Sequence, residues 1–356
     1  MILRLKKANS TFFIIAAIGL LIAVFSSYFL PESFFIDAYI IILDKYNEIG
    51  LVGSYPFSMW FYKHTGLGSL SFPIVALIQY PILIYCLYKI GIPKNFHVVT
   101  LKNLLVYLAI ILIAVFISVP SKEFITFIYI TWIVLMYKNR KRKLKTVLLI
   151  SFTLLFFFAY FFRQYFALVV LLAISMYLVS LINFKIKRVT TIVSAIIIVI
   201  GFSLSYGIVK GRFISEDSRH AFNERRIEKD SKNANSMIRP PLDPDTWYGE
   251  SFGIVYGFFS VNLPFNGLKH FRSPQILAFI IWQTFLIIIL FFRYKRSMKE
   301  GRNENYELWL FYMLFSYFVV QGVFEPDLGS AVRHKIGILP LIYYLLYYED
   351  FRKKLS

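Results

Sequence analysis

The sequence contains a single cysteine, Cys86, which lies in a long apolar run. One cysteine excludes an intramolecular disulfide and a CxxC metal site, and packing as a small hydrophobic side chain accounts for it. The signatures HExxH, GxGxxG, Walker A and GxSxG are missing as well. No carboxylate cluster has the spacing of a metal site, so we expect neither a metal nor another cofactor.

Acidic residues are also scarce. Only 20 Asp and Glu stand against 39 Lys and Arg, which leaves a net charge of +19. Such an excess is often a sign of nucleic-acid binding, but in a membrane protein basic residues collect in the cytoplasmic loops. Because the rest of the composition is strongly apolar, we take the second interpretation and expect no nucleic-acid partner.

Apolar residues dominate the chain, which is 58% hydrophobic and 19% aromatic with a mean hydropathy of +0.62. Soluble domains do not have this composition. The apolar runs approach the ~20 residues that a helix needs to cross ~30 Å of hydrocarbon. The sequence therefore predicts an all-α fold, a single polytopic membrane domain over residues 1–356. About ten transmembrane helices are expected, near 11–30, 69–90, 103–119, 124–137, 146–162, 166–184, 189–208, 275–293, 306–323 and 336–349.

The basic residues orient these helices. With the N-terminus inside, more than half of the 39 Lys and Arg residues fall in cytoplasmic segments, including the run at 138–145. Removing or adding one helix would move that run outside. No small-residue cleavage site follows the first basic residues, so we expect a membrane helix and not a cleaved signal peptide. The predicted location is the bacterial inner membrane, multi-pass, with both termini cytoplasmic.

The first outer loop, 31–68, is one of two long segments expected on the outer face. Its first half is typical of a short amphipathic helix on the membrane surface, with Asp37, Asp44 and Glu48 at the edge. The following stretch YPFSMWFYK is typical of an aromatic belt at the membrane interface.

The large outer segment, 209–274, starts polar and partly helical around 216–232. Its second part is apolar but broken by Gly253, Gly257, Pro264 and Gly267. A spanning helix is an alternative here, but the distribution of basic residues argues against an extra crossing, so we expect this part to lie on the outer interface with its aromatic side chains down. Residues 325–335 are predicted to form the last outer loop, and they contain five ionisable side chains.

Charged residues of the outer loops are the candidates for chemistry. A guanidinium fork binds phosphate oxygens bidentately, and an imidazole accepts or donates a proton at neutral pH. A carboxylate can activate or orient a sugar hydroxyl. Each type also has an ordinary alternative: snorkelling to lipid phosphates, a local ion pair, or an interfacial histidine. The candidates are Lys122, Glu123, Arg163, Arg239, Arg333 and His334.

Several short stretches, in this order and all on the expected outer face, resemble the Wzy-type and EpsG-like polysaccharide polymerases of bacterial surface-glycan loci. They are PSKEF (120–124), FFRQYF (161–166), SMIRPP (236–241), FFSVNLPFNG (258–267) and GSAVRHKIGILP (329–340). The resemblance implies an O-antigen, capsular or exopolysaccharide polymerase that joins undecaprenyl-diphosphate-linked repeat units. The implied partners are a lipid-linked glycan donor and acceptor, the bilayer, and a chain-length regulator.

The resemblance also implies roles for the candidates. Glu123, Arg333 and His334 would be catalytic, while Lys122, Arg163 and Arg239 would bind the diphosphate and sugar. Departure of the lipid diphosphate develops negative charge, which fixed cations stabilise more in the transition state than in the ground state. The diphosphate is already a good leaving group, so we expect turnover without a metal.

Three other functions stay open at this point. A glycan ligase, or another polyprenyl-dependent glycosyltransferase, would have nearly the same sequence signature. A transporter or flippase of lipid-linked glycans would favour ionisable residues deep inside helices, and the predicted helix centres contain almost none. A structural scaffold would tolerate loss of the outer arginines.

Overall fold

A computed structural model describes residues 2–44, 50–228, 236–270, 272 and 274–352. Within these residues the fold is all-α, with an isolated β-bridge between Met237 and Asp327. The chain divides into two compact units. Unit 1 comprises Met1–Gln164 and Arg333–Ser356, and unit 2 comprises Tyr165–Val332.

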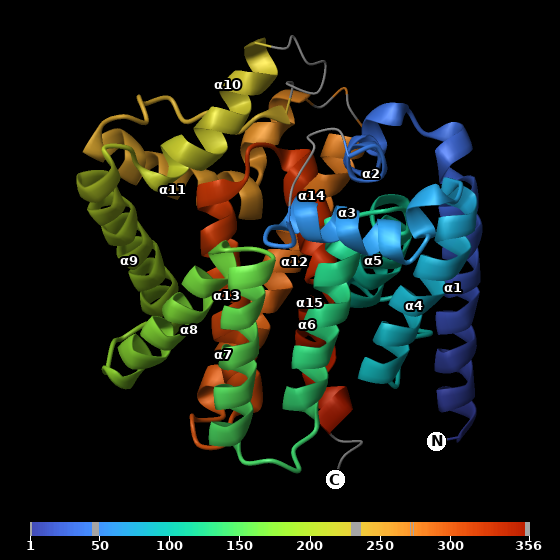
Figure 1. Ribbon diagram of the computed structural model, residues 1–356. Helices are drawn as coiled ribbons and strands as arrows, with labels where there is room; N and C mark the ends of the chain where they lie inside the picture. The colour runs from blue at the N-terminus through green and yellow to red at the C-terminus, as the bar shows by residue number, and fades with distance from the viewer. Residues whose placement is uncertain (1, 45–49, 229–235, 271, 273, 353–356) are drawn as a thin grey trace. The chain divides into compact units, whose positions relative to one another are not determined.

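The described residues of unit 1 form six longer helices and two short ones, besides the end of α14 (Figure 1). α1 packs against α4 and α5, while α6 contacts α4, α7 and α15. The short helices α2 and α3 pack against each other, and α3 also contacts α6. The bounds are α1 Ile2–Phe29, α2 Ile36–Ile42, α3 Ser54–His64, α4 Phe72–Ile90, α5 Leu101–Phe116, α6 Lys122–Lys138, α7 Leu144–Phe161 and α15 Leu339–Arg352, with 3-10 turns η1 Glu32–Phe34 and η2 Leu67–Ser69.

Unit 2 is arranged around α13, which contacts α8, α9, α11 and α12 and is almost completely buried. α14 starts in this unit and continues into unit 1 from Arg333 onward. The bounds are α8 Tyr165–Leu181, α9 Lys187–Lys210, the π-helical turn η3 Glu216–His220, α10 Ala221–Glu228, α11 Trp247–Asn262, η5 Phe265–His270, α12 Pro274–Lys299, α13 Tyr306–Phe324 and α14 Leu328–Gly337.

A helix is present at each of the ten predicted positions, which confirms the helices themselves. Six of the described helices are long and apolar enough to cross a membrane: α1, α4, α7, α9, α12 and α13. α5 and α8 are apolar but shorter. Length and composition therefore support a multi-pass membrane protein, and the number of ten crossings stays a prediction.

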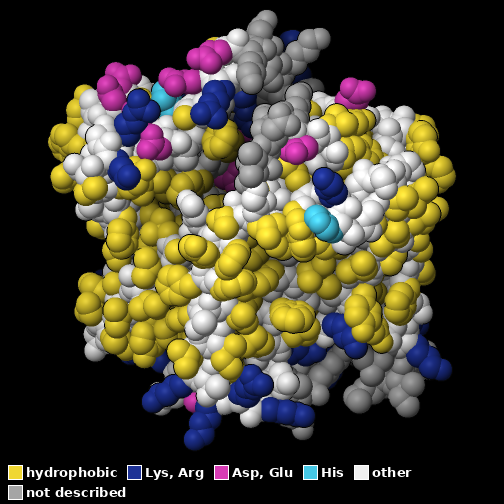
Figure 2. Space-filling view, in the orientation of Figure 1, with side chains coloured by type: hydrophobic (Ala, Val, Ile, Leu, Met, Phe, Trp, Pro, Cys, Tyr) yellow, Lys and Arg dark blue, Asp and Glu magenta, His cyan; other side chains and the backbone are white. Residues whose placement is uncertain are grey.

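The surface of unit 1 has the polarity of a membrane protein. Large hydrophobic side chains on α1 face outward, including Phe13, Leu21 and Phe25 at about half exposure or more. Figure 2 shows hydrophobic side chains on the sides of the helices, with Lys and Arg gathered where Figure 1 places the loop between α6 and α7. An apolar lateral surface with a basic end is what the positive-inside bias produces in a bilayer.

α11 corrects one expectation from the sequence. Gly253 and Gly257 were expected to interrupt a helix, but both lie inside α11 and are buried. A Cβ at Gly257 would lie 1.9 Å from the carbonyl oxygen of Gly322 on α13. The glycines therefore allow two helix backbones to approach closely, a packing device common among membrane helices.

α14 corrects a second expectation, since residues 325–335 were predicted to be a loop. Residues 328–337 form a helix instead. Asp327 caps its start: its Oδ1 accepts a hydrogen bond from the backbone N–H of Ser330 at 2.8 Å, and its Oδ2 accepts one from the Ser330 hydroxyl at 2.8 Å. Such caps satisfy backbone donors that a helix start leaves unpaired.

Candidate functional site

Five of the six candidate residues come together in unit 1. Lys122 and Glu123 form the first turn of α6, and Arg163 lies between α7 and α8. Arg333 and His334 lie on the last turns of α14. These segments are far apart in the sequence, so the meeting of their side chains is a property of the fold. We call Asp37, Tyr55, Lys122, Glu123, Arg163, Arg333 and His334 the charged cluster.

The start of α6 is fixed from two sides. Ser121 is its N-cap, because the Ser121 hydroxyl accepts a hydrogen bond from the backbone N–H of Phe124 at 3.2 Å. The backbone N–H of Ser121 donates to the Tyr62 hydroxyl at 2.9 Å, and that hydroxyl also accepts from Gln79 Nε2 at 2.7 Å. α3 and α4 therefore hold the turn from which Lys122 and Glu123 project.

Glu123 is the centre of the buried half of the cluster. Its Oε1 lies 2.5 Å from Arg163 Nη2 and 3.3 Å from His334 Nε2. Glu123 and Arg163 are both buried, and His334 is partly exposed. A charge-assisted contact in a medium of low dielectric is strong, but it requires that both ions leave water. Glu123 is therefore held in place, and His334 is the residue through which this half of the cluster reaches the surface.

Asp37 is the centre of the outer half. Its Oδ2 lies 2.9 Å from Arg333 Nη1 and 3.8 Å from Lys122 Nζ. Burial raises the pKa of the Asp37 carboxyl, but Arg333 and Lys122 outweigh this effect and the pKa ends below its ordinary value. Asp37 is therefore ionised at neutral pH and shared by two cations.

Tyr55 completes the outer half. Its hydroxyl donates to Asp37 Oδ1 at 3.2 Å, and Lys122 Nζ lies over its ring, 3.6 Å from the centroid. Burial raises the pKa of the Tyr55 hydroxyl, so that this group keeps its proton and acts as a donor at neutral pH. The Lys122 ammonium thus interacts with both a carboxylate and an aromatic face.

Asp37 and Tyr55 were not among the candidates from the sequence. Asp37 stood at the edge of a predicted surface helix together with Asp44 and Glu48, and nothing in the sequence separates the three. Glu48 is outside the described residues. Tyr55 was counted as part of an aromatic belt. Only the folded chain distinguishes Asp37, by placing two cations within 4 Å of one of its oxygens.

The sixth candidate, Arg239, belongs to unit 2 and is exposed. Its Nη2 lies 3.8 Å from the sulfur of Met237. The same stretch is joined to the start of α14, because the backbone N–H of Ile238 donates to the Pro326 carbonyl at 2.8 Å. Nearby, Asp327 forms an ion pair with Arg226, an arginine that does not stand out in the sequence.

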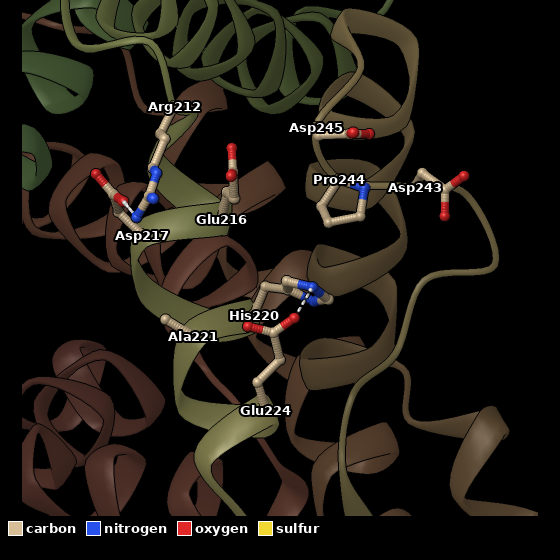
Figure 3. Close-up of a pocket in the computed structure, with 9 residues that line it drawn as sticks. All are labelled: Arg212, Glu216, Asp217, His220, Ala221, Glu224, Asp243, Pro244 and Asp245. Atoms are coloured by element: carbon tan, nitrogen blue, oxygen red, sulfur yellow. Dashed lines mark ion pairs between the residues drawn. The ribbon is translucent and has the colours of Figure 1, made fainter. Parts of the chain in front are cut away.

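A separate cavity of about 370 Å³ lies in unit 2 (Figure 3). Figure 3 shows two ion pairs in its lining: Arg212 Nη1 is 4.0 Å from Asp217 Oδ1, and His220 Nε2 is 3.0 Å from Glu224 Oε1. In the described part of the chain no group of three His, Cys, Asp or Glu side chains has metal-site geometry. The cavity is lined by Arg212, Glu216, Asp217, His220, Ala221, Glu224, Asp243, Pro244 and Asp245.

Unit 2 also contains a buried polar centre that the sequence did not reveal, formed by Arg219 and Glu250. Arg219 Nη1 donates to the carbonyls of Gly253 at 3.1 Å and Gly322 at 2.8 Å. Glu250 accepts hydrogen bonds from the hydroxyls of Ser203 and Ser215. Burial lowers the pKa of Arg219 to about 10, and Glu250 opposes that shift. Arg219 remains charged at neutral pH and joins α11 to α13.

The charged cluster is thus the arrangement best suited to chemistry among the described residues. It offers three permanent cations, an imidazole and two carboxylates, and Asp37 and Arg333 are each about one-fifth exposed. Such a set can attract an anion, orient it and accept a proton. In comparisons with known proteins, the chain matches no family model, no curated protein and no solved structure.

Proposed function

We propose that this protein is a membrane glycosyltransferase that joins undecaprenyl-diphosphate-linked glycan repeat units on the outer face of the bacterial inner membrane. The growing chain on one lipid carrier is the donor, and a hydroxyl of a second lipid-linked unit is the acceptor. The observation that carries the proposal is the charged cluster, assembled from α2, α3, α6, α14 and the α7–α8 turn. The resemblance of the same stretches to polysaccharide polymerases points in the same direction.

The position of the cluster on α6 supports this function. α6 starts with Lys122 and Glu123 and ends at Lys138, a length of 17 residues, so its two ends are about 25 Å apart. At the far end, Lys138 Nζ donates to the carbonyl of Lys89 at 3.3 Å, and the basic loop toward α7 follows. The basic end fits a cytoplasmic face, and the opposite end fits the depth at which a lipid diphosphate lies.

The outer half of the cluster suits the leaving group. Arg333 Nη1 and Lys122 Nζ lie within 4 Å of the same Asp37 oxygen, so two cations are held next to each other. As the C1–oxygen bond of the donor breaks, its electron pair moves onto the diphosphate. Cations already in place stabilise this developing charge without further reorganisation.

The buried half suits proton transfer. The acceptor hydroxyl oxygen bonds to C1 while its proton passes to His334. Glu123 contacts His334 Nε2 and fixes the orientation of the ring, and its negative charge stabilises the imidazolium that forms. Arg163 keeps Glu123 ionised and correctly placed. His334 is therefore the proton acceptor, Glu123 orients it, and Arg163 holds Glu123 in place.

The test is the surface glycan of a strain that lacks this protein and carries a plasmid copy. The wild-type copy should restore a ladder of long chains on a gel, and Arg333→Ala should leave single repeat units at equal membrane expression. Long chains that accumulate on the lipid carrier in the deletion strain would identify a ligase instead. A full ladder from the Arg333→Ala copy would remove the cluster from the reaction.

A further inference from the structure

The Asp37 carboxylate lies between two cations of the charged cluster, and the geometry points to a role for it. We propose that Asp37 is a positioning residue that holds Arg333 and Lys122 side by side as a two-cation seat for the diphosphate of the lipid-linked donor. This inference rests on the proposed glycosyl transfer and adds a residue to it. Asp37 itself touches the cations, and the cations touch the substrate.

Two neighbouring cations do not stay together by themselves. Like charges repel, and Lys and Arg have long side chains with many rotamers. Asp37 Oδ2 is 2.9 Å from Arg333 Nη1 and 3.8 Å from Lys122 Nζ, so a single oxygen fixes both groups. A diphosphate presents anionic oxygens on two adjacent phosphorus atoms, and a fixed pair of cations matches that pattern better than two mobile ones.

Asp37 is itself fixed on both sides. The Tyr55 hydroxyl donates to its other oxygen, Oδ1. On α2, the neighbouring Ala38 is buried in a hydrophobic cluster with Phe35 and Val119, and Val119 comes just before α6. The carboxylate therefore has a defined position relative to Lys122 even though it lies on a short helix.

A second packing contact holds the two short helices together. Ile40 and Ile41 of α2 form a buried hydrophobic cluster with Met59 and Tyr62 of α3. Tyr62 also holds the start of α6 through Ser121. α2, α3 and the first turn of α6 thus form one packed assembly, which transmits the position of Asp37 to the two cations.

The Asp37→Asn variant distinguishes a role in positioning the two cations from a role in the electrostatic attraction of the diphosphate. The substitution removes a negative charge that competes with the diphosphate, so the KM for the donor should stay the same or fall. The cations lose their common anchor, and the maximal rate should drop about 10- to 100-fold, because misplacement by ~1 Å can cost that much. The assay uses vesicles with the full chain and lipid-linked repeat units extracted from the deletion strain, and counts chain extension per folded protein.

Tyr55→Phe gives an independent variant that removes only the hydroxyl donor, and we expect a smaller loss of rate, about threefold to tenfold. Tyr39→Phe, on exposed Tyr39 of α2, is its matched control. Glu32→Gln, an exposed carboxylate in the same outer segment, is the control for Asp37→Asn. Both controls should behave as wild type.

A double variant tests whether Asp37 acts through Arg333. If it does, Asp37→Asn combined with Arg333→Lys, a milder change that keeps a cation at this position, loses less than the product of the two single losses. The positioning role would be overturned if the rate losses of the two single variants simply multiply in the double variant. It would also be overturned if Asp37→Asn raises the KM for the donor. If wild-type vesicles extend no chain at all, the proposed function fails. If Arg333→Ala abolishes extension while Asp37→Asn and Tyr55→Phe keep the wild-type rate, only the positioning role fails.

Discussion

Each unit of the molecule buries an arginine and a glutamate, but the two pairs have different surroundings. In unit 2, Arg219 donates to two backbone carbonyls, and Glu250 accepts from serine hydroxyls. In unit 1, Arg163 contacts Glu123 directly, and Glu123 also contacts the partly exposed His334.

This contrast distinguishes buried charges that hold helices together, as in unit 2, from buried charges that belong to a candidate functional site, as in unit 1. A charge whose partners are backbone carbonyls and hydroxyls has its hydrogen bonds satisfied inside the fold and joins helices together. A charge whose partners are other ionisable side chains, some of them exposed, belongs to a network that a ligand or a proton can change. We therefore expect unit 2 variants to lower stability and unit 1 variants to lower activity.

The largest effect is expected where α11 meets α13. Gly257→Ala places a Cβ 1.9 Å from the carbonyl oxygen of Gly322, a backbone atom that cannot move aside. We expect a loss of about 3 kcal/mol or more and little folded protein after detergent extraction, since overpacking against backbone is costly. Gly201→Ala on α9 has open space around the new Cβ and should extract like wild type. Equal yields from both variants would contradict the close contact.

Arg219→Met should be the next most damaging change. It leaves two glycine carbonyls and Glu250 buried without the guanidinium, and breaking a buried charged network typically costs about 3–5 kcal/mol. Thermal unfolding in detergent measures this loss. Arg212→Met, at a side chain that is 70% exposed, is the control and should leave the melting temperature unchanged. A stable Arg219→Met protein would mean that the polar centre is not needed for folding.

His334→Gln tests the proton acceptor in unit 1. Glutamine can still donate a hydrogen bond to Glu123 but cannot take up a proton at neutral pH, so glycan extension should fall about 100-fold or more. The melting temperature should change little, because His334 is partly exposed. His64→Gln, on the exposed histidine of α3, should keep full activity. Normal chain lengths with His334→Gln would exclude His334 as the base.

Arg163→Lys refines the comparison of the two units, because it keeps the positive charge at this position but removes the planar guanidinium group. We expect the protein to fold, because a cation still faces Glu123, while extension falls about 10- to 100-fold as the geometry behind His334 loosens. Arg212→Lys is the matched exposed control. The result is a rate per folded protein, and a rate equal to wild type would show that charge alone is sufficient at this position.

The smallest effect concerns pH and Asp37. Because the folded pKa of Asp37 is lowered, its contribution to stability is present above the ordinary carboxyl value of ~3.9 and is lost as pH falls through the lowered value. The difference in melting temperature between wild type and Asp37→Asn should therefore be constant from about pH 8 to 5 and shrink below about pH 4. A difference that disappears between pH 7 and 5 would place the pKa above its ordinary value.

Much of the fold could be predicted from the sequence. Each of the ten apolar runs is a helix, because a long apolar run must satisfy its backbone hydrogen bonds internally. Two predictions were wrong, in stretches where the local residue types suggest a different structure from the one that packing produces. Gly253 and Gly257 were expected to interrupt the apolar stretch, but both lie inside α11, and Gly257 packs closely against α13. Residues 325–335 were predicted to be a loop because they are polar, yet Asp327 caps a helix there.

The candidate site could be predicted only in part. Lys122, Glu123, Arg163, Arg333 and His334 stood out as charges between apolar runs. Asp37 and Tyr55 did not, since one was among several acidic residues of a surface helix and the other was in an aromatic run. No periodicity or spacing encodes an ion pair between residues 37 and 333.

The sequence by itself determined the helices, the polarity of their ends and the residue types available at each end, because these depend on runs of neighbouring residues and on transfer from water. The tertiary structure alone decided that Glu123 faces Arg163 and His334, that Asp37 joins Arg333 to Lys122, and that Arg219 bonds to glycine carbonyls. Such pairings need side-chain atoms within 4 Å across tens to hundreds of residues, and only packing of the helices can bring them together.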